Sequence, residues 1–479
     1  MKTFKFKLVD LNIKRWRIVL SDDILLKDPL VLSFVGENVV IGRRSILIAD
    51  GVISGLGEYS LLRKYSRDVH VIDCRDKLAI PGFINAHTHI PMTVFRGVAD
   101  NYTTLTWLKI IWPLEKLLTK EDIYYGALLG LIESVKSGTT CIADHYFNEE
   151  VVIEVSKKIG VRIVGSESIL DIDGWRDGEK SVSETLRLYR RYKDDPLVKI
   201  AFAPHSVYSV KRETFELIRK FSKEYNIDIH IHASESVEEV NRSLELYGKT
   251  PIEYLDSLGL MSERLLIAHA NVVNDNELRL IKSKGANIVH VPTTAMKHGL
   301  DICPVSKMLR YGVTVSLGTD GAGSNNNLDM IEEMRIAVLA QRFLFKNPRA
   351  ISAKDALFMA TINGGKALNL KNVGNIAPGF KADIVLLNLK RERMVPLHNV
   401  PSHVVFSVNQ SDIDLVIVNG KIIVENGRIL TVDEEFILER VQRVFEKLVN
   451  KGGLIPSLSS EPRKSIVELG CKSINLLRK

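Results

Sequence analysis

Short apolar runs that end near a histidine or an acidic residue recur along the middle of this chain and constrain its fold more than any other feature. Each run has the length and composition of a β-strand, and helical stretches such as 121–137 and 327–345 separate the runs. This alternation predicts βα units around a parallel sheet. Eight units predict a (β/α)8 barrel, an α/β fold, and the expected strand ends are His89, Asp144, Glu167, His205, His232, His269, His290 and Asp320.

An open, doubly wound sheet is the alternative arrangement of such units. It requires a glycine-rich turn after the first strand, and the sequence has none after His89. The glycine-rich segments 318–323 and 364–366 lack the complete phosphate-loop pattern and are more typical of turns. We therefore expect the barrel.

Both ends of the chain carry β-hairpin signals outside the barrel segment. Asp50-Gly51 and Asn419-Gly420 each separate two apolar stretches, which is typical of a tight hairpin turn. Two all-β blocks that flank an α/β middle predict one small β-sandwich built from both chain ends. Further strands are expected at 69–73, 382–388 and 404–408; the expected divisions are 1–80 and 376–430 for the sandwich, 81–375 for the barrel and 431–479 for a basic tail with a helix near 465–477.

The composition is that of a globular protein without a membrane anchor. Hydrophobic residues make up 45% of the 479 residues and charged residues 26%. The sequence contains no apolar run of about 18 residues, and its first residues do not resemble a signal peptide. The four cysteines are scattered without metal-site spacing, so we expect reduced thiols and a cytoplasmic location. Only three glutamines occur, which favours a thermophilic source.

The net charge of +7 raises the question of a nucleic-acid partner. Residues 1–20 carry +5 and residues 451–479 carry +4, which leaves −2 for the rest of the chain. A nucleic-acid-binding surface usually carries a basic stripe interleaved with aromatic residues on the folded body. The basic character here belongs to the two ends, so solvated termini are the favoured interpretation and a nucleic-acid role is disfavoured.

His87 and His89 form the most informative short motif. Two histidines two apart on an extended segment point to the same side, so both imidazoles can reach one metal ion. The pair alone is weak evidence, because such pairs are more often half-buried polar side chains. Histidine and aspartate at the ends of other strands strengthen it, since barrel enzymes place their chemistry there. The candidate metal ligands are His87, His89, His232 and Asp320.

The remaining strand-end groups suit proton transfer. A catalytic metal needs protein ligands that leave one position open for water, and a nearby group that shuttles protons. Asp320 can also accept a proton from that water, while Glu235 and His269 are left for proton transfer and for polarising the attacked atom. The fourth strand ends at Pro204-His205 without a lysine, which favours one metal over two. Zinc, iron(II), manganese and cobalt all tolerate three histidines and a carboxylate, and zinc is the favoured choice.

Longer motifs carry a resemblance to a known family. The segments PGFINAHTHIPMTVFRGVAD, IHIHASE, IAHA, VTVSLGTDGAGSNNNLDMIEEMR and IAPGFKADIVLLNL resemble the amidohydrolase superfamily, in its cytosine/adenosine-type deaminase branch. That branch includes 5'-methylthioadenosine/S-adenosylhomocysteine deaminases and s-triazine hydrolases. The resemblance covers roughly residues 45–426. It implies a distorted (β/α)8 barrel with a two-ended β-sandwich, and a homo-oligomer.

The resemblance also implies roles for individual residues. His87, His89, His232 and Asp320 would hold the metal. Glu235 would protonate a ring nitrogen of the substrate and return the proton to the leaving amine, and His269 would hold the attacking hydroxide or the tetrahedral centre.

Two further positions match substrate contacts of the family. Glu115 matches a residue that contacts ribose hydroxyls, and His205 matches a substrate-binding histidine. A helix-surface carboxylate and a strand-end capping histidine are the alternatives for these two residues.

The chain departs from the family at several positions. Thr293-Thr294-Ala295 replaces an amide-bearing segment, and His145 follows Asp144 where a methionine is common. The segment 166–181 offers only Arg176 for a substrate carboxylate, which disfavours S-adenosylhomocysteine.

The sequence thus favours a metal-dependent hydrolytic deaminase that acts on an adenine nucleoside, of the adenosine or 5'-methylthioadenosine type. The alternatives are an aminohydrolase or chlorohydrolase of another heteroaromatic ring, such as a triazine, pterin or guanine, and a non-catalytic scaffold on the same fold. Retention of all six core positions argues against the scaffold, and Glu235 favours amine release because a halide needs no protonation.

Overall fold

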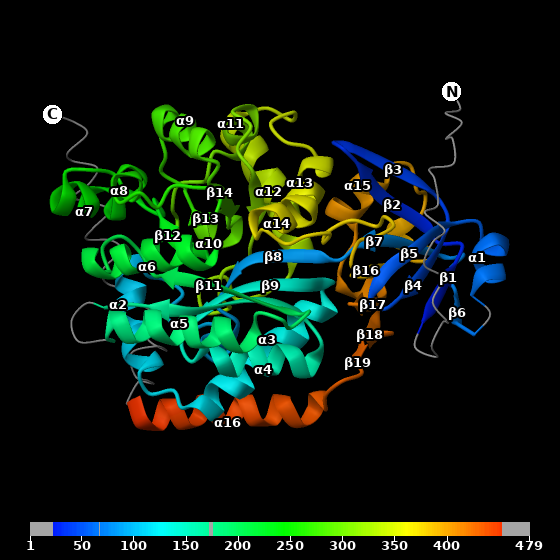
Figure 1. Cartoon of the computed structure of the whole chain (residues 1–479), viewed down its shortest axis with the longest axis horizontal. Helices are drawn as coiled ribbons and strands as arrows, with labels where there is room; N and C mark the ends of the chain where they lie inside the picture. Colours follow the sequence, from blue (N-terminus) through cyan, green and yellow to red (C-terminus); the bar gives the residue numbers. More distant parts are fainter. Residues whose placement is uncertain (1–22, 67, 172–175, 453–479) are drawn as a thin grey trace.

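The computed structural model describes residues 23–66, 68–171 and 176–452, and its centre is a parallel β-barrel (Figure 1). Each barrel strand pairs in parallel with the next one along the chain. The strands are β8 (Phe83–Thr88), β9 (Thr139–Tyr146), β10 (Arg162–Ile169), β11 (Val198–Pro204), β12 (Asp228–Ala233), β13 (Leu265–His269), β14 (Asn287–His290) and β15 (Val315–Leu317). The expected (β/α)8 fold is confirmed, and every expected strand end lies within three residues of an observed one.

The barrel closes where the segment after β15 meets β8. The backbone N–H of Asp320 donates to the carbonyl oxygen of His87 at 3.0 Å. Gly318 lies so close to β8 that a Cβ atom there would sit 2.8 Å from the backbone nitrogen and oxygen of His87. Only glycine allows this approach, which brings Asp320 beside the first strand.

Helices surround the barrel, and their ends follow local capping rules. Helix α3 (Lys120–Lys136) begins with a capping box between Thr119 and Asp122. Helix α12 (Met330–Phe345) begins after Asp329, whose side chain accepts the N–H groups of Ile331 and Glu332. These two helices match the expected stretches. The other helices between and around the strands are α2 (Thr104–Glu115), α4 (Glu149–Ile159), α5 (Gly178–Tyr192), α6 (Arg212–Tyr225), α7 (Val237–Tyr247), α8 (Pro251–Ser257), α9 (Asp275–Lys284), α10 (Pro292–Lys297), α11 (Val305–Arg310), α13 (Ala353–Ala360) and α14 (Ile362–Ala367), with a 3-10 helix η1 (Ile90–Phe95).

Strands from both chain ends form the accessory sandwich at one side of the barrel (Figure 1). In its seven-stranded sheet, β16 (Ile384–Asn388) pairs antiparallel with β7 (Lys77–Pro81) and so joins late strands to early ones. The two sheets enclose an aliphatic core. The other strands of that sheet are β2 (Leu30–Val35), β3 (Asn38–Arg43), β17 (Ile413–Val418), β18 (Lys421–Glu425) and β19 (Arg428–Ile429), and the second sheet holds β1 (Ile24–Lys27), β4 (Ser45–Ala49), β5 (Val52–Gly57) and β6 (His70–Asp73).

The two expected hairpin turns are present and lie against each other. Asp50-Gly51 and Asn419-Gly420 have φ angles of 52°, 73°, 48° and 79°, as a tight hairpin turn requires. A Cβ atom on Gly51 would lie 2.9 Å from the backbone oxygen of Asn419. Glycine is therefore required both for the turn and for the contact between the two chain ends.

The strand expected at 404–408 is wrong. This segment is a π-helical turn, η3 (His403–Ser407), that follows the short helix α15 (Val400–Ser402). Arg335 of α12 donates to the carbonyl oxygens of Val405 and Val408 at 3.2 and 2.7 Å. Packing against α12 supplies the partners that a neighbouring strand would give, so tertiary contacts override the β-propensity of the valines.

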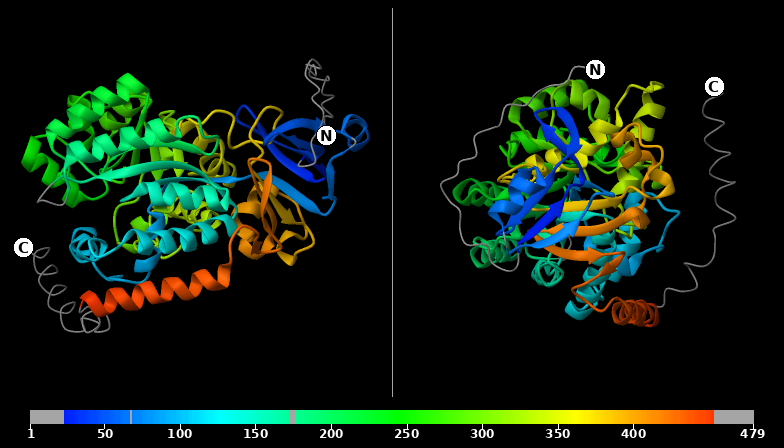
Figure 2. Two further views of the ribbon diagram at one scale, coloured as in Figure 1. Left: turned by 60° about the horizontal axis from the view of Figure 1, so that its bottom comes forward. Right: turned by 90° about the vertical axis from the view of Figure 1, so that its right-hand side faces the viewer.

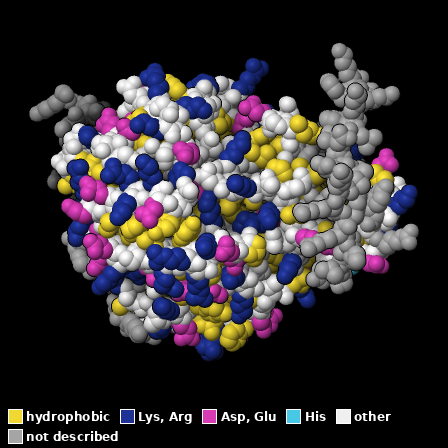
Figure 3. Space-filling model, viewed as in Figure 1, with side chains coloured by type: hydrophobic (Ala, Val, Ile, Leu, Met, Phe, Trp, Pro, Cys, Tyr) yellow, Lys and Arg dark blue, Asp and Glu magenta, His cyan; other side chains and the backbone are white. Residues whose placement is uncertain are grey.

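Helix α16 (Glu434–Gly452) lies along the outside of α3 (Figure 2). Ile437, Val441 and Val444 are buried, and Lys447 pairs with Asp122 at the start of α3. The helix expected near 465–477 lies outside the described residues. Among the described helices, none combines the length and apolarity needed to cross a membrane. On the face in Figure 3, basic and acidic side chains are interspersed over the barrel.

Candidate active site

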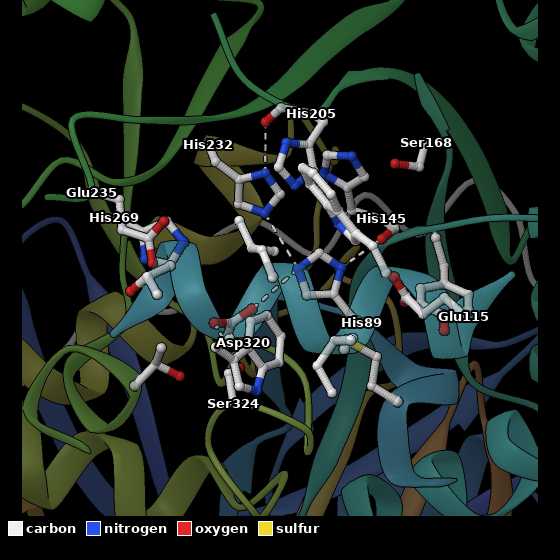
Figure 4. Close-up of a pocket in the computed structure, with 18 of the residues that line it drawn as sticks. His89, Glu115, His145, Ser168, His205, His232, Glu235, His269, Asp320 and Ser324 are labelled. Atoms are coloured by element: carbon white, nitrogen blue, oxygen red, sulfur yellow. Dashed lines mark hydrogen bonds and ion pairs between the residues drawn. The ribbon is translucent and has the colours of Figure 1, made fainter. Parts of the chain in front are cut away.

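The sequence-predicted site residues come together at the C-terminal end of the barrel strands (Figure 4). His87 and His232 lie in β8 and β12, His89 and His205 directly follow β8 and β11, and His269 ends β13. Parallel strands place their C-terminal ends at one mouth of the barrel, which explains the convergence. One pocket is lined by His89, Glu115, His205, His232, Glu235, His269 and Asp320, while His87 is fully buried beside it.

The candidate ligand atoms of His87, His89, His232 and Asp320 lie close together, and His269 lies near them. The Nε2 atoms of His87 and His89 lie 3.3 and 3.1 Å from Oδ1 of Asp320. The Nε2 atom of His232 lies 3.3 Å from that of His89. Two ligand groups have all their donor atoms within 4.8 Å of one another: His87, His89 and Asp320, and His87, His232 and His269. The structure thus brings the four predicted ligands together and adds His269 as a neighbour within reach.

The hydrogen bonds of these histidines leave their Nε2 lone pairs free to bind a cation. Nδ1 of His89 and Nδ1 of His232 lie 2.6 and 2.7 Å from the carbonyl oxygens of His145 and His205. A carbonyl only accepts, so both Nδ1 atoms carry the proton and both Nε2 atoms present lone pairs toward each other. Nε2 of His87 is buried without a hydrogen-bond partner. Facing lone pairs repel, so the arrangement requires a positive charge between them, either a proton or a divalent metal ion.

Asp320 is held in an unusual backbone conformation. Its φ angle is 61°, and Ser324 donates to its Oδ2 at 2.9 Å. Burial opposes ionisation, yet the imidazoles of His87 and His89 close to its carboxylate hold the pKa of Asp320 well below its usual range. The carboxylate is therefore charged and able to bind a cation.

Glu235 and His269 lie together on one side of the ligand histidines (Figure 4). Burial raises the pKa of Glu235 to about 8, and the charge of Asp320 adds to this rise. Burial lowers the pKa of His269 to about 4. At neutral pH the pocket therefore holds a protonated carboxyl and a neutral imidazole at this end, both suited to acid–base work.

Glu115 and His205 lie away from Glu235 (Figure 4). Glu115 ends α2 and lines the pocket, where burial raises its pKa to about 7. Burial lowers the pKa of His205 to about 3, and its Nδ1 lies 3.0 Å from Oγ of Ser209. Both side chains reach the pocket, rather than the helix surface or a strand cap alone.

The structure adds pocket residues that the sequence did not assign. Trp107 and Trp112 of α2 supply an aromatic wall, Thr294 and His298 also line the pocket, and the ring of His298 lies edge-on to Trp107 at 5.8 Å between centroids. His145 is buried and stacks on the ring of His232 at 4.7 Å between centroids. The helical spacing of Trp107, Leu108, Ile111 and Glu115 was the available signal for α2, but spacing does not show which helix faces the pocket.

The sequence matches known proteins over most of its length. The model of the amidohydrolase family matches residues 78–423. The chain is 39% identical over 425 residues to a 5-methylthioadenosine/S-adenosylhomocysteine deaminase of Pyrococcus furiosus, covering 88% of this chain and 100% of that protein. It is 39% identical to a 5'-deoxyadenosine deaminase of Methanobrevibacter smithii, covering 89% of this chain and 98% of that protein.

Solved structures show the same fold. An adenosine deaminase from Xanthomonas campestris with bound zinc superposes with a TM-score of 0.86 at 29% identity, covering 89% of this chain and 99% of that one. An atrazine chlorohydrolase from Arthrobacter aurescens with zinc gives 0.82 at 27% identity, covering 88% and 100%. The family match spans most of the sequence, and the relatives are matched over nearly their whole length. The chain belongs to the amidohydrolase family.

Proposed function

We propose that this chain is a metal-dependent hydrolytic deaminase that releases ammonia from the amino-substituted ring of an adenine nucleoside. The observation that carries the proposal is one pocket that joins a cation-binding cluster to Glu235, a protonated carboxyl outside that cluster. The relatives named as adenosine-type deaminases support the same chemistry.

His87, His89, His232 and Asp320 would hold the metal ion, which we propose to be a single zinc because the donor set and the zinc-bound structural relatives agree. A bound divalent ion lowers the pKa of water to about 7 and so makes hydroxide available at neutral pH. Iron(II) and manganese also suit these ligands.

Glu235 supplies the proton that the leaving amine needs. In the protonated form it donates to a ring nitrogen, which makes the adjacent amino-bearing carbon electrophilic. Asp320 accepts the first proton that the attacking water loses. Glu235, which has given its own proton to the ring nitrogen, takes the proton of the new hydroxyl group and passes it to the amine as the carbon–nitrogen bond breaks. The proton on Asp320 then returns to Glu235. One water is consumed, and the products are the keto form of the ring and ammonia. His269, neutral at pH 7, hydrogen-bonds the incoming oxygen.

The two ends of the pocket set the orientation of the substrate. With the amino group at Glu235 and His269, the ribose points toward Glu115, whose carboxyl oxygens accept hydrogen bonds from ribose hydroxyls. His205 contacts the ring between these ends. The aromatic wall of Trp107 and Trp112 offers flat apolar surface to the purine.

A second candidate is hydrolysis of another heteroaromatic ring, which the likeness to the atrazine chlorohydrolase favours. Glu235 weighs against a halide as the leaving group, because a halide leaves without protonation. A pterin, guanine or aminotriazine would still use it.

We propose a cytoplasmic location and a homo-oligomeric state for the enzyme. Three of its cysteines, Cys74, Cys141 and Cys303, are buried and unpaired, and burial raises the pKa of all three thiols. Unpaired thiols fit a reducing compartment. Light scattering of the purified protein tests the oligomeric state.

The test of the function is ammonia release by metal-loaded enzyme. The panel holds adenosine, 5'-deoxyadenosine, 5'-methylthioadenosine, S-adenosylhomocysteine, guanine, cytosine and an aminotriazine, with Glu235→Gln as control. Release from an adenine nucleoside that the variant loses supports the proposal. Release only from the triazine or guanine favours the second candidate, and no release with metal bound contradicts both.

A further inference from the structure

The loops that follow β12 and β13 are joined by backbone hydrogen bonds. The N–H of Ala270 donates to Ala233 at 3.1 Å, and that of Val272 donates to Ser234 at 2.9 Å. Ser234, His269 and Ala270 all have positive φ angles, of 56°, 73° and 49°. Such conformations cost free energy for residues other than glycine and persist only where the surroundings fix them.

The peptide groups of Glu235 are held from both sides. Its N–H donates to Oε2 of Glu239 at 2.7 Å, and its carbonyl oxygen accepts from Nδ2 of Asn271 at 3.0 Å. We refer to Glu239 and Asn271 as the Glu235 clamp. One half of the clamp comes from the first turn of α7, and the other half from the loop that begins at His269.

Both members of the clamp are buried. Glu239 is 3% exposed and Asn271 is 5% exposed, so solvent does not compete for their hydrogen bonds. The backbone N–H of Glu239 donates to Oγ of Ser236, the N-cap of α7, at 3.1 Å. The clamp therefore ties Glu235 to a helix end on one side and to the loop that carries His269 on the other.

Neither Glu239 nor Asn271 is among the residues that line the pocket. Their hydrogen bonds go to the backbone of Glu235, so any influence on the reaction passes through that residue. A carboxyl that transfers protons must lie within hydrogen-bond distance of the reacting atom, and small displacements lower the rate steeply.

Resting on the deaminase function proposed above, we propose that Glu239 and Asn271 are positioning residues that fix the Glu235 carboxyl at the reacting ring nitrogen and couple its place to that of His269. The clamp leaves substrate affinity to the opposite end of the pocket. Its loss therefore lowers kcat more than it changes KM.

The first test compares Glu239→Ala, Asn271→Ala and Glu239→Gln with Glu238→Ala, all as full-length metal-loaded protein. Glu238 is the exposed neighbour on the same helix and serves as the matched control. We expect the two alanine substitutions in the clamp to lower kcat by about 10²-fold, with KM and bound metal unchanged. Glu239→Gln keeps an acceptor and retains most of the activity, and Glu238→Ala matches the parent.

A double-substitution cycle separates positioning from a general structural role. In single-turnover measurements, adding Glu239→Ala to Glu235→Gln should have almost no further effect, because the residue through which it acts is already removed. If Glu239→Ala costs the same factor in both backgrounds, Glu239 acts independently of Glu235 and the proposal is overturned. Equal activity of Glu239→Ala and the parent overturns it as well.

Amide hydrogen exchange tests the clamp without catalysis. The N–H of Glu235 should exchange faster in Glu239→Ala than in the parent, and unchanged in Glu238→Ala. Unchanged exchange in Glu239→Ala contradicts the clamp. A parent enzyme that releases no ammonia contradicts the proposed function instead, and the exchange result still decides whether the clamp holds Glu235.

Discussion

The catalytic end of the barrel and the β-sandwich use left-handed backbone differently. In the two sandwich hairpins it falls on Asp50-Gly51 and Asn419-Gly420, residue types that adopt it readily. At the barrel mouth it falls on Ser234, His269 and Ala270, where hydrogen bonds between loops hold it in place. The sandwich thus contributes stability from relaxed turns and an aliphatic core. At the site, strained backbone lowers the free energy of unfolding but fixes the directions of the side chains.

Glu235→Gln should give the largest difference between an effect on activity and an effect on stability. We expect kcat to fall by about 10³-fold, since proton transfer is lost, while the melting temperature stays equal or rises because a buried ionisable group is removed. Steady-state kinetics and thermal unfolding of the same preparation check both parts. A variant that loses activity only together with its stability would erase the contrast.

Ile384→Ala in β16 should do the opposite. Ile384 is fully buried between the two sheets, and its truncation should cost about 2–5 kcal/mol of the free energy of unfolding. At temperatures where the variant is folded, kcat and KM should match the parent. Urea denaturation measures the loss, with the exposed Lys421→Ala on β18 as control. A changed kcat in the folded variant would show that the sandwich also shapes the site.

The pH dependence of the free energy of unfolding should show how much an ionised Glu235 destabilises the folded protein. Burial raises its pKa from 4.5 to about 8, so the folded metal-free protein keeps a proton that the unfolded chain releases. The stabilising contribution is complete below pH 4.5 and is lost as the pH rises through about 8. In chelator-treated protein, the free energy of unfolding should fall relative to Glu235→Gln by up to about 1.4 kcal/mol per pH unit. Parallel pH profiles for the two proteins would refute this.

Glu115→Gln probes the ribose end of the pocket. We expect kcat/KM for adenosine to fall about tenfold, or about 1.4 kcal/mol, mainly through KM, because one carboxyl oxygen that accepts from the ribose hydroxyls is replaced by an amide nitrogen that cannot accept. A substrate whose ribose lacks both the 2' and 3' hydroxyls should not distinguish the variant from the parent. An equal loss on both substrates would remove Glu115 from ribose binding.

Ala270→Gly should have the smallest effect of these substitutions. Glycine relieves the left-handed strain at φ 49°, and the gain should be roughly 0.5–1 kcal/mol in the free energy of unfolding. Asn419→Gly in the sandwich turn should gain less, since asparagine already tolerates φ 48°. Chemical denaturation of the two variants compares them. An equal gain would mean that strain is not concentrated at the site.

The barrel and its polar strand ends could be predicted because each apolar run ends near a histidine or acidic residue at the same mouth. The valines of 404–408 could not, since Arg335, far away in sequence, supplies their hydrogen bonds. A C-terminal helix is expected within 431–479, but the bounds of α16 could not be predicted, because its buried face is defined by α3 and η1. Asn271 carries no local signal either, because only the adjacency of β12 and β13 brings it to Glu235. For Glu239 the Ser-x-x-Glu pattern at 236–239 indicates a helix start, but it does not show that the carboxylate accepts the N–H of Glu235.

The most direct test of the central claim is adenosine hydrolysis in ¹⁸O-labelled water by metal-loaded enzyme. The account predicts one ammonium released per inosine formed, one labelled oxygen on the former amino-bearing carbon, and formation of both products about 10³-fold more slowly with Glu235→Gln. A parent that binds metal and converts none of the adenine nucleosides, or forms product without the label, would contradict it.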